Sequence, residues 1–211
     1  MAESTPSIVV FVNRKSGGRM GERIFNEFES IVGSMHCFYM DTGLQDGLQK
    51  CAELLKQSGD AYQKVLDKGK SDPEYQKDPK LHVISVESIL RVLVAGGDGT
   101  VGWLLTAMDN YKGIPSFVRI PVAHLPLGTG NDFARSTNWG GGYDGGRAEQ
   151  ILEDVKVAEV HALDRWKLEL ENLENHEKKD YYFQNYCSFG CDAAIAYEFH
   201  HLRETHPEKF T

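Results

Sequence analysis

Apolar and polar residues follow one another along the chain in a unit that occurs three times. In each unit a short apolar run leads into a glycine-rich turn, and then into a segment with apolar residues at helical spacing. The three units cover residues 7–32, 91–111 and 122–139. Strand, loop and helix in this order, with strands apolar on both faces, are typical of a parallel sheet covered by helices. We therefore predict an α/β fold: an open, mostly parallel sheet with helices on both faces.

The segments between and after these units follow other patterns. Residues 43–55 place apolar side chains on one face, which predicts a helix, and residues 147–155 predict a shorter one. Residues 57–90 are charged, poor in apolar side chains and interrupted by Pro73 and Pro79, so we expect a mobile surface insertion there.

The last part of the chain departs from the strand–loop–helix pattern. Residues 165–173 alternate between apolar and charged, which predicts a strand with one solvated face. A charged turn over 174–180 and a second strand over 181–190 would complete an antiparallel hairpin, and residues 192–204 predict a helix. A hairpin and one helix provide little core, so we expect exposed apolar side chains there. We accordingly divide the chain into a nucleotide-binding α/β lobe, 1–155, and the start of an incomplete second β lobe with one helix, 156–211.

Composition and charge exclude several classes of protein. The 211 residues carry a formal net charge of −8, which argues against a nucleic-acid partner and against simple electrostatic docking on anionic lipid. No apolar run reaches the roughly 18 residues of a transmembrane helix, and residues 1–13 lack the features of a secretory signal. The four cysteines form no zinc pattern and are expected to be reduced thiols. These features predict a cytoplasmic protein.

The three glycine-rich turns are the candidate functional site. Parallel strands end along one edge of a sheet, where α/β sheets bind their ligands, so the three loops should meet there. Each loop offers backbone N–H groups and leads into the N-terminus of a helix, which carries a partial positive charge. The loops therefore predict a phosphate site, but the second loop, GGDGT, places Asp98 at its centre.

Several interpretations of Asp98 compete. It could be the cap of the following helix in a purely structural turn. Gly97, Gly99 and Gly102 also match the G-x-G-x-x-G pattern of dinucleotide folds, but Asp98 would then face a pyrophosphate, and residues 117–125 contain no acidic ribose ligand. A P-loop is excluded, because no G-x-x-x-x-G-K-[ST] sequence occurs.

A divalent cation explains the carboxylate best. Mg²⁺ bridges phosphate oxygens and accepts carboxylate or water ligands, and the same carboxylate could orient an attacking hydroxyl. The pattern favours a kinase that uses Mg-ATP without a Walker A lysine.

Seven segments resemble, in order, the catalytic region of eukaryotic diacylglycerol kinases: VFVNRKSGG, VAGGDGTVGW, LPLGTGNDFAR, WGGGY, LDRW, NYCSFGCDAAIAYEFHHLRE and PEKF. GGDGT is shared with sphingosine and ceramide kinases, and its GGDG core with NAD kinases, whereas LPLGTGND followed by WGGGY and LDRW is far narrower. The resemblance implies a lipid kinase of signal transduction that transfers the γ-phosphate of ATP to the hydroxyl of diacylglycerol, giving phosphatidic acid. It also implies ATP and Mg²⁺ as cofactors and transient, peripheral recruitment to a membrane surface.

The resemblance also implies roles for individual residues. Asp98 is the principal catalytic candidate and the metal ligand, through water, with Asp132 and Asp164 as further carboxylates. The implied nucleotide-binding residues are Asn13, Ser16, Gly17, Gly18, Gly96, Gly97, Asp98, Gly99, Thr100, Gly128, Thr129, Gly130 and Asn131.

The sequence departs from the family in three ways. Arg14 stands where animal members usually have proline, no cysteine- and histidine-rich domain precedes the catalytic region, and the family's second lobe continues beyond PEKF. Two alternatives therefore stay open: a sphingoid-base or ceramide kinase, and a catalytically incomplete fragment that binds nucleotide. His124, in the strand before LPLGTGND, is expected to be a buried strand histidine rather than a catalytic one.

Overall fold

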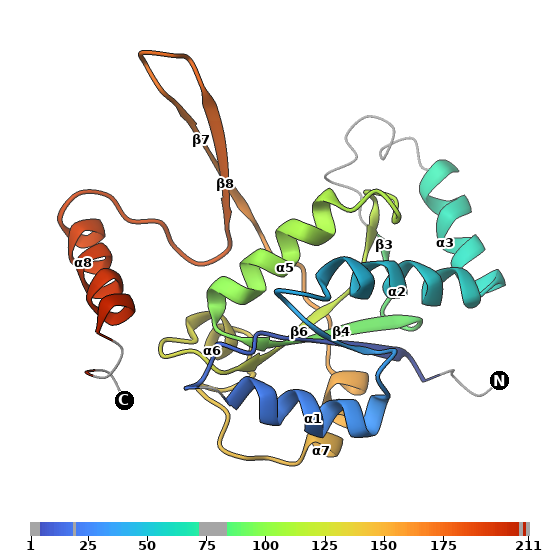
Figure 1. Ribbon diagram of the computed structural model, residues 1–211. Helices are drawn as coiled ribbons and strands as arrows, with labels where there is room; N and C mark the ends of the chain where they lie inside the picture. Colours follow the sequence, from blue (N-terminus) through green and yellow to red (C-terminus); the bar gives the residue numbers. More distant parts are fainter. Residues whose placement is uncertain (1–4, 19, 72–83, 207–208, 210–211) are drawn as a thin grey trace. The chain divides into compact units, whose positions relative to one another are not determined.

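The computed structural model describes residues 5–18, 20–71, 84–206 and 209 (Figure 1). The chain divides into two compact units, Met1–Ala162 and Leu163–Thr211.

A four-stranded sheet, sheet A, forms the centre of the first unit. Its strands in spatial order are β2 (Cys37–Tyr39), β1 (Ser7–Val12), β4 (Leu90–Gly96) and β6 (Val122–Pro126). All neighbouring pairs are parallel, which confirms the predicted parallel sheet. The chain leaves β1 for β2 on one side and returns to β4 on the other, so the strand order reverses between β1 and β4.

Helices cover both faces of sheet A, as predicted (Figure 1). One face packs against α1 (Met20–Val32) and α7 (Ala148–Val157). The other packs against α2 (Leu44–Gln57), α5 (Asp98–Asn110) and the short α6 (Asp132–Ser136). Strand β1 shows why both faces are dry: Val10 and Val12 point to the first face, Val9 and Phe11 to the second, and all four side chains are fully buried.

The segment predicted as a surface insertion contains regular structure. Residues Asp60–Ser71 form helix α3, whose Tyr62 is buried in the core and whose Gly69 faces the Phe117 ring. A second, two-stranded parallel sheet pairs β3 (Ile84–Ser85) with β5 (Val118–Arg119). Pro73 and Pro79 lie outside the described residues.

The second unit contains the predicted antiparallel hairpin and helix. The hairpin pairs β7 (Trp166–Glu171) with β8 (Lys178–Phe183), and helix α8 spans Cys191–Thr205. Strand β8 begins at Lys178, inside the segment predicted as a turn. The pairing of the two strands extends to Glu171, whose partner is Lys178. The expectation of one solvated face is wrong for β7, where Trp166 and Leu170 are exposed as well as the charged residues.

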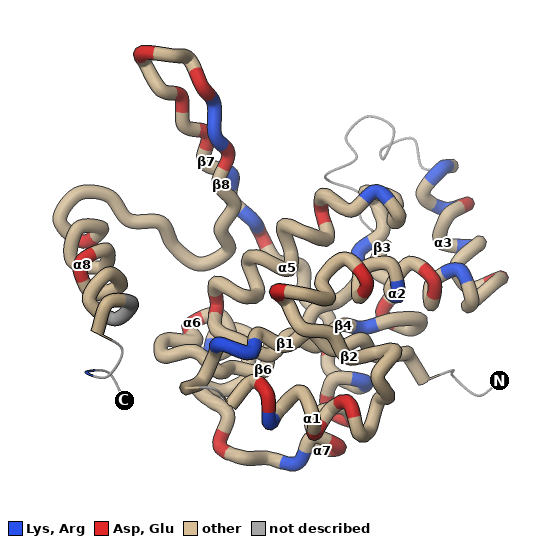
Figure 2. The backbone as a smooth tube through the Cα atoms, in the orientation of Figure 1, with Lys and Arg blue, Asp and Glu red and all other residues tan. Residues whose placement is uncertain are grey.

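Charged side chains lie mainly on the helices and the hairpin, and the strands of sheet A are nearly free of them (Figure 2). Among the described residues, no helix is both long enough and apolar enough to cross a membrane.

Candidate functional site

The three glycine-rich loops begin at the same edge of sheet A. Val12 of β1 is in register with Ala95 of β4, and Gly96 of β4 is in register with Pro126 of β6. The loops therefore leave the carboxyl ends of three adjacent strands. The first two flank the point where the strand order reverses, which is where open α/β sheets bind ligands.

A side-chain hydrogen bond ties the first loop to the second. The Asn13 Nδ2 amide donates to Thr100 Oγ1 at 2.9 Å, and the Asn13 backbone N–H donates to the carbonyl of Ala95 at 2.9 Å. Thr100 is buried, so this hydrogen bond joins the two loops in the interior of the unit. Gly17 and Gly18 turn the first loop with φ values of +63° and +60°, in the left-handed region that favours glycine.

The second and third loops meet through glycine backbones. A Cβ added to Gly128 would lie 2.8 Å from the Cα of Gly97, so a side chain at Gly128 would force the loops apart. The Leu127 N–H donates to the Gly96 carbonyl at 2.8 Å and continues the ladder into the loops. The three candidate loops are thus brought together, as the parallel topology requires.

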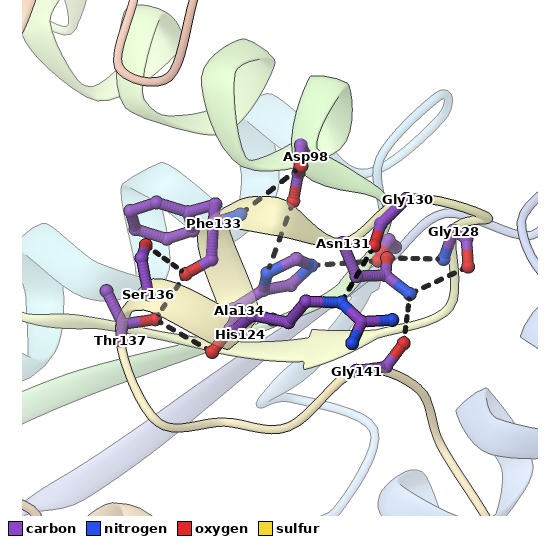
Figure 3. Close-up of polar contacts among 12 residues, drawn as sticks. Asp98, His124, Gly128, Gly130, Asn131, Phe133, Ala134, Ser136, Thr137 and Gly141 are labelled. Atoms are coloured by element: carbon purple, nitrogen blue, oxygen red, sulfur yellow. Dashed lines mark hydrogen bonds and ion pairs between the residues drawn. The ribbon is translucent and has the colours of Figure 1, made fainter.

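Asp98 is the first residue of α5, but among the described contacts its carboxylate caps a different helix (Figure 3). Asp98 Oδ2 accepts a hydrogen bond from the Phe133 backbone N–H, at the start of α6, at 3.3 Å. The carboxylate links the second loop to the third, and its side chain remains 22% exposed at the edge of the sheet.

His124 lies directly beneath Asp98, a contact that the sequence analysis did not predict. It is fully buried in β6, as predicted, with Nδ1 3.9 Å from Asp98 Oδ1. Burial lowers the pKa of His124, outweighing the hydrogen bond to the Gly96 carbonyl and the Asp98 charge, which both raise it. Burial therefore favours the neutral imidazole, and the 3.9 Å between Nδ1 and Oδ1 is longer than a hydrogen bond.

Asn131 closes the third loop on itself. It adopts a left-handed conformation, with φ of 55°, and is buried. Its Oδ1 accepts from the Gly128 N–H at 2.9 Å, while Nδ2 donates to the carbonyls of Gly128 and Gly141 at 2.7 and 3.0 Å. The Asn131 side chain is thus used to shape the loop, whereas Thr129 and Gly130 are exposed at its tip.

The other two carboxylate candidates differ in their placement. Asp132 is exposed in the first turn of α6, beside the contact made by Asp98. Asp164 belongs to the second unit, where its side chain is exposed, so the geometry of the first unit does not include it. Within the described residues, no group of three or more His, Cys, Asp or Glu side chains could hold a metal ion by itself.

Arg14 is a second residue whose structural role the sequence did not reveal. Its guanidinium lies 4.1 Å from the ring centroid of Tyr39, 3.2 Å from the carboxylate of Asp41 and 3.1 Å from Thr42 Oγ1. These contacts fasten the first glycine loop to the segment between β2 and α2. The one sequence signal for these contacts was the basic residue directly after Asn13.

The arrangement can bind an anion at the start of α5. No side chain among the described residues caps Gly97, and the helix begins with Thr100 N–H donating to the Gly97 carbonyl. The first amides of such a helix lack partners within the helix and carry a partial positive charge. Gly99 is exposed there, next to the Asp98 carboxylate.

Family models match nearly the whole chain. The model of the diacylglycerol kinase catalytic domain matches residues 7–168, and that of the diacylglycerol kinase accessory domain matches residues 182–211.

Alignments with curated relatives cover almost all of this chain. The chain is 37% identical over 213 residues to a probable diacylglycerol kinase 3 of Caenorhabditis elegans and to diacylglycerol kinase iota of Homo sapiens. It is 38% identical over 214 residues to diacylglycerol kinase zeta of Rattus norvegicus. Each alignment covers 96% of this chain but only 22%, 17% and 19% of the relatives, so the chain spans about a fifth of their length.

A solved structure of a putative diacylglycerol kinase from Bacillus anthracis str. Sterne is also similar. It aligns with 64% of this chain and 37% of its own, at 18% identity and a TM-score of 0.35. A TM-score this low supports no argument about the site.

Proposed function

Because the chain belongs to the diacylglycerol kinase catalytic-domain family, we propose that it transfers the γ-phosphate of ATP to the free hydroxyl of diacylglycerol, giving phosphatidic acid. The activity is proposed for this chain from its relatives' names and from its own site.

The convergence of three glycine-rich loops around the start of α5 carries the proposal. Asn13, Thr100, Gly97 and Gly128 fix these loops to one another at the reversal of strand order. Backbone amides at this edge would bind the ATP phosphates, with the α5 N-terminus supplying partial positive charge.

The residues present fit a magnesium ion held together with the nucleotide. Mg²⁺ is usually bound by one or two carboxylates, several waters and the substrate phosphates. Asp98, partly exposed beside the α5 amides, and Asp132, exposed in the first turn of α6, provide such carboxylates. When bound, the ion would neutralise phosphate charge during transfer.

The chain's own residues would act mainly by positioning. The loops would hold the triphosphate, and the Asp98 carboxylate would orient the lipid hydroxyl. The hydroxyl oxygen would bond to the γ-phosphorus as the bond from that phosphorus to the β–γ bridging oxygen breaks. ADP would leave with that oxygen, and the hydroxyl proton would be released to solvent. We also propose Asp164 as a further catalytic carboxylate.

The acceptor lipid implies work at a membrane surface. We propose peripheral and transient recruitment, since diacylglycerol resides in membranes. Exposed aromatic side chains of the second unit, among them Tyr186 and Phe189, each 71% exposed, are suited to contact an apolar substrate.

The test is transfer of labelled γ-phosphate from Mg-ATP to diacylglycerol in mixed micelles. We expect product with the natural chain and a loss of at least about 100-fold with Asp98→Asn. Asp46→Asn is the matched control, because Asp46 is an exposed aspartate in the first turn of α2. Sphingosine and ceramide as acceptors test the alternative substrates.

Two outcomes would contradict the proposal. If phosphate were transferred faster to sphingosine or ceramide than to diacylglycerol, the faster lipid would be the acceptor. Mg-ATP binding without transfer to any of the three lipids would reduce the chain to a nucleotide-binding module.

A further inference from the structure

The buried histidine beneath the GGDGT loop has a more specific position than strand packing requires. His124 has the only polar side chain in β6, Val122–Pro126, and that side chain is 0% exposed. Its ring lies 5.8 Å from the Phe133 ring (Figure 3). Burying a polar ring in an apolar strand costs free energy, and each hydrogen bond that its nitrogens make reduces this cost.

The contact of Nε2 defines the tautomer. Nε2 lies 2.9 Å from the Gly96 carbonyl oxygen, which can only accept, so Nε2 carries the proton. The same oxygen accepts the Leu127 N–H at 2.8 Å. Two donors thus hold the carbonyl of Gly96, which lies two residues before Asp98.

The second nitrogen faces the carboxylate. Nδ1 has no hydrogen-bond partner within the described part of the chain. It lies 3.9 Å from Asp98 Oδ1, while Asp98 Oδ2 accepts the Phe133 N–H. One edge of the imidazole therefore holds the backbone that presents Asp98, and the other borders the carboxylate.

We propose that His124 is a positioning residue for Asp98: its Nε2–H holds the carbonyl of Gly96, two residues before Asp98, and thereby fixes the backbone that presents the carboxylate. The positioning exists in the folded chain without any ligand. Its consequence for phosphoryl transfer rests on the proposed function.

Three substitutions separate the two edges of the ring. His124→Gln can place an amide N–H near the position of Nε2 and keep the bond to Gly96. His124→Asn can place a polar atom only near Nδ1. His124→Leu fills the space without either, and its thermal unfolding reports whether the fold is kept.

The first readout needs no activity. Long-range ¹H–¹⁵N spectra of the whole chain, with the His124 signals assigned by their loss in His124→Gln, report the tautomer. We expect a protonated Nε2, and backbone amide shifts at Gly97–Gly99 that change in His124→Leu and His124→Asn but stay close to natural in His124→Gln. A His124 without a proton on Nε2, or unchanged shifts in His124→Leu, would overturn the proposal, even if the chain transfers no phosphate.

The second readout is steady-state kinetics in the micelle assay. We expect kcat to fall by about tenfold or more in His124→Leu and His124→Asn, because small displacements of a catalytic group are costly. The KM for ATP should change little, and His124→Gln should restore kcat to within about threefold. Equal losses in His124→Gln and His124→Leu, or a change in KM alone, would contradict positioning of Asp98.

Discussion

The apolar side chains of sheet A and those of the β7–β8 hairpin lie in opposite surroundings. In β1, Val9, Val10 and Phe11 are 0% exposed, because helices cover both faces of the sheet. In the second unit none of the described side chains is buried, and Trp166 is 62% exposed. An apolar strand contributes to a core only where a second layer covers it. The candidate site belongs to the first kind of region: its loops are exposed, but rigid strands carry them.

Thiol reactivity should give the largest contrast between the two units. Cys37 and Cys51 are buried in the first unit, and Cys187 and Cys191 are exposed in the second. Burial raises the pKa of Cys37 and of Cys51 to about 12, with Glu29 adding to the effect at Cys37. We expect a maleimide to modify Cys187 and Cys191 at least about 10³-fold faster than the two buried thiols, because a buried thiol reacts only when the surrounding structure unfolds locally. Mass spectrometry after digestion identifies the sites, and rapid labelling of Cys51 would refute the contrast.

The same pKa shifts set an expected pH dependence. A raised pKa means that the folded state holds the thiol proton more tightly than the unfolded state does. The stabilisation is complete below the ordinary value of 9.0 and is lost as pH rises toward 12. Cys51→Ala should therefore flatten the alkaline decline in the free energy of unfolding, measured by urea titration. A slope identical to that of the natural chain would contradict this.

Leucine truncation should give the next largest difference. Leu90→Ala removes a side chain that is 0% exposed in β4, and we expect a loss of about 2–5 kcal/mol in the free energy of unfolding. Leu173→Ala is the matched control, because Leu173 is 89% exposed in the second unit and should have almost no effect. Similar losses for both variants would show that the second unit is covered in solution.

Arginine substitutions in the first unit should have a smaller effect. Arg14→Ala removes the contact with the Tyr39 ring and the ion pair with Asp41, and we expect a loss of about 1 kcal/mol. It should also weaken ATP binding by loosening the first loop, as measured by calorimetry. Arg23→Ala is the control, since Arg23 pairs with Glu27 on the exposed face of α1 and should leave stability and binding unchanged. Equal losses of stability and of ATP affinity in Arg14→Ala and Arg23→Ala would show that the Arg14 contacts do not hold the first loop.

The sequence predicted most of the fold because strand–loop–helix units have a local signature. It did not predict strand order, which depends on pairings such as Val12 with Ala95 across distant segments. Helix α3 was missed because its sequence is mostly charged and polar, and only a few of its residues, among them Tyr62, Val65 and Leu66, pack against the core.

The site was predictable as a set of loops and less so as a set of contacts. Glycines after strands indicated where the loops would lie. The hydrogen bond between Asp98 and Phe133 and the contact between Asp98 and His124 join residues about 30 positions apart, from helices α5 and α6 and strand β6. Such contacts leave no spacing pattern in a single sequence, although one histidine in an otherwise apolar strand marks the place.

The most direct test of the central claim is a crystal structure of the chain with Mg²⁺ and a non-hydrolysable ATP analogue. We predict that the phosphates lie at the start of α5, between the loops that follow β1 and β4, with Asp98 bound to the metal directly or through water. Phosphates bound at another edge of the sheet, or a metal remote from Asp98, would contradict the account.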